Sequence, residues 1–159
     1  MPKSMLVLRA AHPDEAQRLH DAYGAWADPF VLPRSTNELR GAASRGLIFV
    51  IEEAGAFVAA TGVFDLREDA YVESGGTYVA RELRGFGLQS LFFELRAVSV
   101  AMNFGPDVRF TTAIAPDNTP SLKNAIRNGF VTMSPIPEQV GAPCNSCPKQ
   151  AKLVEPRIC

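Results

Sequence analysis

The feature that most constrains this chain is a glycine-rich turn between an apolar run and a long helical pattern. Tyr71 to Val79 is typical of a strand, in which Gly75 and Gly76 indicate a bulge or a close backbone approach. Arg84-Gly85-Phe86-Gly87 follows this strand. Leu88 to Met102 then repeats apolar residues at i, i+3, i+4 and i+7, which predicts a helix. The apolar residues expected on its inward face are Leu88, Leu91, Phe92, Leu95, Val98 and Met102. Glycines leave backbone N–H groups open, and a helix N-terminus attracts anions. The turn is therefore a candidate phosphate site, with Arg81 and Arg84 as nearby positive charges.

The remaining segments predict one mixed α/β domain over residues 1–159, a length suited to a single core. Ser35-Thr36-Asn37-Glu38 has the form of a capping box and predicts a helix start, which Gly46 is placed to end. The element order is βααβββαβαβ(β). Besides Tyr71–Val79, the expected strands are Met5–Leu8, Leu47–Glu52, Ala56–Phe64, Val108–Ile114, a strand beginning at Phe130–Met133, and Ala151–Val154. The other expected helices start near Pro13, Ser35 and Asn118. In the last of them, Leu122, Ala125 and Ile126 are expected to point inward.

Composition excludes several classes of protein. Sixteen Lys and Arg against 17 Asp and Glu give a net charge of -1, which argues against a nucleic-acid binder. No apolar run approaches the length of a membrane span. The three cysteines gather at the C-terminal end, two of them in a loop expected at 135–149, unlike the spread of a disulfide-built fold. A cytoplasmic protein with no metal is expected, although a redox pair or a metal site at the cysteines stays open.

Two motifs in this order carry a family resemblance. Val79 followed by Arg84-Gly85-Phe86-Gly87 resembles motif A of the GNAT superfamily of acyl-CoA-dependent N-acyltransferases, whose turn Q/R-x-x-G-x-G/A holds the pyrophosphate of coenzyme A. Further along, Asn118, Ser121 and Gly129-Phe130 resemble the family's next strand-and-helix unit. The expected element order is also similar to the family fold, which is α/β of the α+β type, with a mixed, mostly antiparallel sheet flanked by helices.

The resemblance implies transfer of an acetyl group from acetyl-CoA to a small-molecule or protein amine by direct attack on the thioester. It implies pantetheine contacts from Asn118 and from the Val79 backbone, and a backbone N–H near Val79 that would stabilise the oxyanion. The pyrophosphate would be held by the turn and the first helical residues, namely Arg84, Gly85, Phe86, Gly87, Leu88 and Gln89. A homodimer is an open option, and no nucleic-acid or membrane partner is expected.

For the proton transfers, the first candidates are Glu73 as general base and Tyr78 as acid. Strand alternation predicts Glu73, Gly75, Thr77 and Val79 on one face, although a solvent-facing glutamate and a packed core tyrosine are the plainer alternatives. Two departures from the family pattern stand out. Gln89 occupies a turn position that is usually Gly or Ala in the family. Ala125 occupies the position where many family members have a tyrosine that protonates the departing thiolate.

These departures keep a second function open, a catalytically weak or inactive GNAT-like protein that senses acyl-CoA or assembles with partners. Trp26 and Phe30 are interpreted as core residues, with an acceptor pocket for an apolar or aromatic amine as the alternative. Lys123 and Arg127 on the last helix are interpreted as solvated, with the 3'-phosphate of the adenosine as the alternative.

Overall fold

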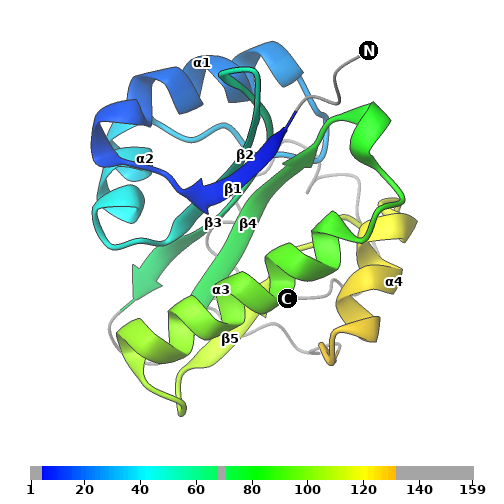
Figure 1. Cartoon of the computed structure of the whole chain (residues 1–159). Coiled ribbons are helices and arrows are strands. Elements are labelled where there is room, and N and C mark those ends of the chain that lie inside the picture. Colours follow the sequence, from blue (N-terminus) through cyan, green and yellow to red (C-terminus); the bar gives the residue numbers. More distant parts are fainter. Residues whose placement is uncertain (1–4, 68–70, 132–159) are drawn as a thin grey trace.

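The computed structural model describes residues 5–67 and 71–131 (Figure 1). Its five-stranded sheet has the order β1-β2-β3-β4-β5, antiparallel except for β5, which runs parallel to β4. The strands are β1 Leu6–Ala10, β2 Ile48–Glu53, β3 Ala56–Arg67, β4 Tyr71–Val79 and β5 Arg109–Thr112. The α-helices are α1 Ala16–Trp26, α2 Thr36–Ser44, α3 Leu88–Phe104 and α4 Thr119–Arg127. The predicted fold class is confirmed; the expected strand 151–154, most of the expected strand 130–133, and all three cysteines lie outside the described residues.

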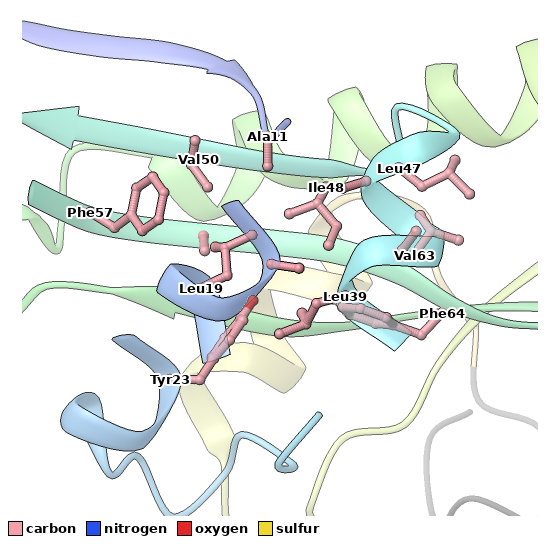
Figure 2. Packing of buried hydrophobic residues seen from close by; sticks show 14 of the residues in the cluster. Ala11, Leu19, Tyr23, Leu39, Leu47, Ile48, Val50, Phe57, Val63 and Phe64 are labelled. Carbon is pink, nitrogen blue, oxygen red and sulfur yellow. The ribbon is translucent and has the colours of Figure 1, made fainter. Parts of the chain in front are cut away.

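The helices cover the sheet from both sides, with α1 and α2 on one face and α3 on the other (Figure 1). Leu19 and Tyr23 of α1 and Leu39 of α2 are buried against strand residues that include Ile48 and Phe64 (Figure 2). On the α3 side, Phe92 packs against Ile51 and Ala59. Burial of these apolar side chains on both faces fixes α3, and hence the turn before it, against the sheet.

The predicted capping box at the start of α2 is confirmed. The Glu38 N–H donates to Ser35 Oγ at 3.3 Å, and the Ser35 N–H donates to Glu38 Oε2 at 2.8 Å. Gly46 follows the helix with a φ of +68°, a left-handed conformation that favours glycine. The start and the end of this helix therefore follow from local sequence chemistry.

The predicted inward face of α3 is partly wrong. Val98 and Met102 are 58% and 81% exposed, whereas the buried positions are Phe92, Phe93, Arg96, Ser99 and Val100. The helix carries apolar residues around most of its circumference, so periodicity alone does not select the face that meets the sheet. In α4, likewise, Ile126 was expected inward but is 53% exposed.

A bulge in β4 changes the face on which its side chains lie. Ala60 pairs with Tyr78 and Gly62 pairs with Gly75, so β4 holds one extra residue there. Gly76 has a φ of +59°, and its carbonyl accepts a hydrogen bond from the Tyr23 hydroxyl at 2.6 Å. The sequence signal for a bulge or close approach at Gly75 and Gly76 is confirmed.

Candidate active site

The strands β4 and β5 separate beyond Ser74 and leave a gap in the sheet. Their pairing ends at Ser74 and Thr112, two residues short of the expected strand end at Ile114. A cavity of about 570 Å³ occupies this region and extends to the turn before α3. It is lined by Gly75, Gly76, Thr77 and Val79 of β4, by Thr112 and the three residues after it, and by residues of α3 and α4.

The backbone of Val79 faces this gap. The Ala80 N–H donates to the Val58 carbonyl at 2.9 Å, on the β3 side. Because successive residues of an antiparallel edge alternate in the direction of their backbone groups, the N–H and C=O of Val79 point to the open side. Arg84 Nε donates to the Val79 carbonyl at 2.9 Å, which leaves the Val79 N–H directed at the cavity.

The glycine turn presents an uncapped helix N-terminus to the same cavity. Gly85 and Gly87 have φ values of +87° and +79°, so both use the left-handed conformation. Gly87 is the N-cap, with no side-chain cap, and the helical ladder starts with the Leu91 N–H donating to the Gly87 carbonyl. The amides of the first turn therefore lack helical acceptors and form an anion-binding end.

Most of the residues predicted to bind a cofactor are brought together here. The side of the cavity near the turn and α4 includes Val79, Arg84, Gly85, Gly87, Leu88, Gln89 and Asn118. Phe86 is 77% exposed and does not line the cavity. Arg127, interpreted as solvated, also lines the cavity.

The side chains of Gln89 and Asn118 are anchored at the start of α4. Gln89 Nε2 donates to Ser121 Oγ at 3.0 Å, and the Ser121 N–H donates to Asn118 Oδ1 at 3.4 Å. Gln89 therefore turns toward α4, where a partner accommodates its length. Asn118 acts as the N-cap of α4, so the predicted pantetheine contact would fall to its amide nitrogen.

The two residues expected to transfer protons lie away from the cavity. The bulge places Glu73 with Phe64 on the α1 and α2 face, while Thr77 turns to α3, so the predicted common face is wrong. Glu73 is 7% exposed. Tyr78 stacks on Trp26 with ring centroids 4.1 Å apart, which agrees with the alternative that Tyr78 is a packed tyrosine. Ala125, at the position of the missing tyrosine, is fully buried.

Three charged residues that line the cavity, Asp28, Arg96 and Asp117, were missed by the sequence interpretation. Asp28, treated only as part of a turn, lines the cavity, and its Oδ2 atom lies 3.7 Å from Arg84 Nη2. Arg96 lines the cavity from within α3, although its side chain is 1% exposed. Phe30 also lines the cavity, whereas Trp26 packs against the core. A charged residue within an apolar helical stripe is the one sequence signal that pointed to Arg96.

Within residues 5–67 and 71–131, no cluster of His, Cys, Asp or Glu is arranged to hold a metal ion. In the same part of the chain, no helix combines the length and the apolar character needed to cross a bilayer.

No protein-family model and no curated protein matches the sequence, but solved structures match the fold. A GNAT-family acetyltransferase from Streptococcus pneumoniae aligns over 81% of this chain and 86% of its own, with a TM-score of 0.66 and 16% identity. Naa50 of Arabidopsis thaliana, solved with the bisubstrate analogue CoA-Ac-MVNAL, aligns over 80% and 84%, with a TM-score of 0.64 and 14% identity.

Diaminobutyrate acetyltransferase of Paenibacillus lautus, solved with its substrate L-2,4-diaminobutyric acid and coenzyme A, aligns over 78% of this chain and 74% of its own. Its TM-score is 0.60 at 16% identity. These neighbours define the class to which the architecture corresponds. The chain has the fold of the GNAT acetyltransferases.

Proposed function

We propose that this protein is an N-acyltransferase that transfers an acetyl group from acetyl-CoA to an amine. The observation that carries the proposal is the cavity between the separating ends of β4 and β5, which is continuous with the uncapped N-terminus of α3. A phosphate-bearing cofactor with a long polar arm fits this arrangement, because the anion site and the open strand edge adjoin. The matching folds whose structures hold coenzyme A or its analogue support the assignment.

Two regions of the chain would hold the coenzyme. The amides of Leu88, Gln89 and Ser90, freed by the left-handed turn at Gly87, would bind the pyrophosphate. The open edge of β4 at Val79 and the Asn118 amide would hold the pantetheine arm as an added strand. Arg84 joins these parts, because it lies in the turn and donates to the Val79 carbonyl.

The reaction needs a free amine and a stabilised carbonyl oxygen. The amine nitrogen forms a bond to the thioester carbon, the carbon–sulfur bond breaks, and coenzyme A leaves as the thiol. The proton lost by the nitrogen passes to a carboxylate or to water, and the departing sulfur takes up a proton from solvent or an acid. The Val79 N–H, directed at the cavity, is the donor for the carbonyl oxygen as negative charge develops there.

Asp28 and Glu73 are the two candidates for the base. Asp28 borders the cavity, whereas Glu73 would need the acceptor to enter from the α1 and α2 face of β4. Tyr78, which stays a candidate acid, lies on the same face as Glu73. The acceptor is an amine of a small molecule or of a peptide, in line with the neighbours solved with diaminobutyric acid and with a peptide analogue.

Titration calorimetry with coenzyme A and acetyl-CoA tests the cofactor, and thiol release across a panel of amines tests the transfer. We expect micromolar binding of both ligands and thiol release with a subset of amines. Absence of binding at millimolar concentration would refute the proposal. Binding without thiol release for any amine would instead support the alternative of a GNAT-like protein that binds acyl-CoA without fast turnover.

A further inference from the structure

The side chain of Arg96 in α3 is buried, at 1% exposure, although arginine is usually exposed on a helix. Its Nε donates to the Phe92 carbonyl at 3.1 Å, and its Nη1 donates to Thr77 Oγ1 at 3.0 Å. The guanidinium also lies 4.4 Å from the centre of the Phe93 ring. These contacts hold the group at the wall of the cavity, where Arg96, Phe93 and Thr77 are neighbours.

The positive charge of Arg96 has no anionic partner in the described part of the chain. All ion pairs found among residues 5–67 and 71–131 involve other cations. Burial lowers the pKa of Arg96 to about 9, with the Tyr23 hydroxyl as a smaller opposing influence, so the group is still a cation at neutral pH. A buried cation is unfavourable unless an anion joins it, and this is the situation that a bound ligand would relieve.

The position of Arg96 separates it from the phosphate end of the cavity. Arg96 follows Leu88 by eight positions in α3, which corresponds to roughly 12 Å along the helix axis. The bulge at Gly76 turns Thr77 to the α3 side, two residues before Val79 on β4. A thioester at Val79 would therefore direct its acyl group toward Thr77 and Arg96.

We propose that Arg96 selects an acyl donor whose chain ends in a carboxylate, such as malonyl-, succinyl- or glutaryl-CoA. The inference rests on the proposed function, because it places the coenzyme in the same cavity. The free Nη2 edge of the guanidinium and the Nη1 atom would bind the carboxylate in charge-assisted hydrogen bonds. The transfer itself is unchanged: the thioester bond breaks, the amide bond forms, and the distal carboxylate is carried over intact.

A carboxylate on the acceptor amine is the other source of the same chemistry. The donor is favoured because Arg96 belongs to α3, the helix that starts at the phosphate turn, and contacts Thr77 on the α3 side of the sheet. The acceptor would enter, by contrast, from the region of Asp28 and Phe30, which lie between α1 and α2 and line the cavity. The two sources predict different results when donor and acceptor are varied separately.

The test compares the binding of coenzyme A, butyryl-CoA and succinyl-CoA by calorimetry, without acceptor. Butyryl and succinyl chains have the same length and differ in the terminal carboxylate. We expect the wild type to bind succinyl-CoA about tenfold to a hundredfold more tightly than butyryl-CoA. Arg96→Gln should abolish that difference while coenzyme A itself binds as before. Mass analysis of the product then identifies the acyl group transferred.

Arg45→Gln is the matched control, because this exposed arginine also lies over a phenylalanine ring, at 4.6 Å from the centre of Phe104, and is away from the cavity. It should keep the succinyl preference. If coenzyme A fails to bind the wild type, the proposed function is wrong. If coenzyme A binds but succinyl-CoA has no advantage over butyryl-CoA, the present inference alone is wrong.

Three further outcomes would also overturn the donor assignment. In the first, Arg96→Gln keeps the preference for succinyl-CoA. In the second, the variant slows acetyl, butyryl and succinyl transfer equally, which would indicate that Arg96 stabilises the reacting carbonyl. In the third, it raises the KM of carboxylated amines only, which would assign Arg96 to the acceptor.

If Arg96→Gln does not fold, Arg96→Lys, which keeps the charge, serves instead. A retained preference for carboxylated acyl-CoA with a shifted optimum of chain length supports the assignment. An unaltered dependence on acyl chain overturns it.

Discussion

Asp28 is the carboxylate at the cavity on the side where the loop between α1 and α2 approaches the phosphate turn. One of its oxygens accepts the Phe30 N–H at 2.9 Å, and the other lies 3.7 Å from Arg84 Nη2. Its side chain is 20% exposed, so a proton taken from an amine has a path to solvent. These features make Asp28 the stronger candidate for the base, ahead of Glu73 on the other face of β4.

We expect Asp28→Asn to lower kcat/KM for the amine by about a hundredfold, because asparagine keeps the hydrogen bond to Phe30 but accepts no proton. The affinity for coenzyme A should change little, and the loss should shrink at high pH, where the amine is already neutral. Glu73→Gln is the comparison variant. A pH–rate profile altered by Glu73→Gln, most strongly at low pH, with Asp28→Asn unaffected, would instead assign the base to Glu73.

The turn before α3 is the element on which cofactor binding depends, and its geometry requires glycine. Gly87 has a φ of +79°, and a Cβ atom there would meet no other atom within 4 Å, so strain rather than collision opposes substitution. Gly87→Ala should therefore lower the free energy of unfolding by about 1 kcal/mol. Relaxation of the strained backbone at the alanine should also turn the first N–H groups of α3 away from the cavity and weaken coenzyme A binding at least tenfold.

Gly24→Ala is the matched control for this prediction. Gly24 lies in α1, also has open space around a Cβ, and does not use a left-handed φ. The alanine should stabilise the helix by roughly 0.5 to 1 kcal/mol and leave coenzyme A affinity unchanged. Urea titration and calorimetry measure both quantities. Equal effects of the two substitutions on cofactor affinity would contradict the assignment of the turn.

Elements whose signals are local could be predicted from the sequence. The capping box at Ser35, the glycine turn and the order of strands and helices all depend on residues close together in the chain. The side of α3 that is buried could not be predicted, because its apolar residues surround the helix and the choice depends on the sheet. The position of Arg96 at the cavity could not be predicted for the same reason, because it depends on the contact between α3 and Thr77 of β4.

The face of β4 on which Glu73 lies is a second feature that could not be predicted from the sequence. Gly75 and Gly76 indicated a bulge, but a bulge reverses the face of every residue on one side of it. Whether Glu73 or Thr77 turns to α3 depends on the register against β3, which only the long-range pairing fixes. The cofactor half of the site could thus be predicted from a motif, whereas the catalytic half depends on strand register.

At the scale of the whole molecule, one charged network connects the first strand, the segment leading into α1, and β2. Two nitrogens of Arg9 donate to the two carboxylate oxygens of Glu15, each at 2.7 Å. Arg9 Nε also donates to Glu52 at 2.9 Å, and Arg18 donates to the same carboxylate at 2.9 Å. Glu52 of β2 is distant in the chain from Arg9, Glu15 and Arg18, so the whole network forms only when the sheet and α1 have assembled.

This network predicts how stability depends on pH. The hydrogen bonds from Arg9 lower the pKa of Glu15 from near 4.5 to about 2, although burial opposes the shift. Because the folded pKa is lower than the unfolded one, the unfolded chain binds more protons between these values. The stabilisation is complete above about pH 5 and is lost as the pH falls toward 2. Partial exposure of Arg9 reduces the contribution to about 1–2 kcal/mol.

Urea unfolding at a series of pH values, for the wild type and for Glu15→Gln, measures this contribution. The variant should be less stable near neutral pH by about 1–2 kcal/mol, and the difference should vanish as the pH approaches 2. Asp21→Asn is the control, because Asp21 is an exposed carboxylate of α1 whose partner is the neutral amide of Gln17. A difference between wild type and Glu15→Gln that stays constant down to pH 2 would show that Glu15 stabilises the fold by packing, not by its charge.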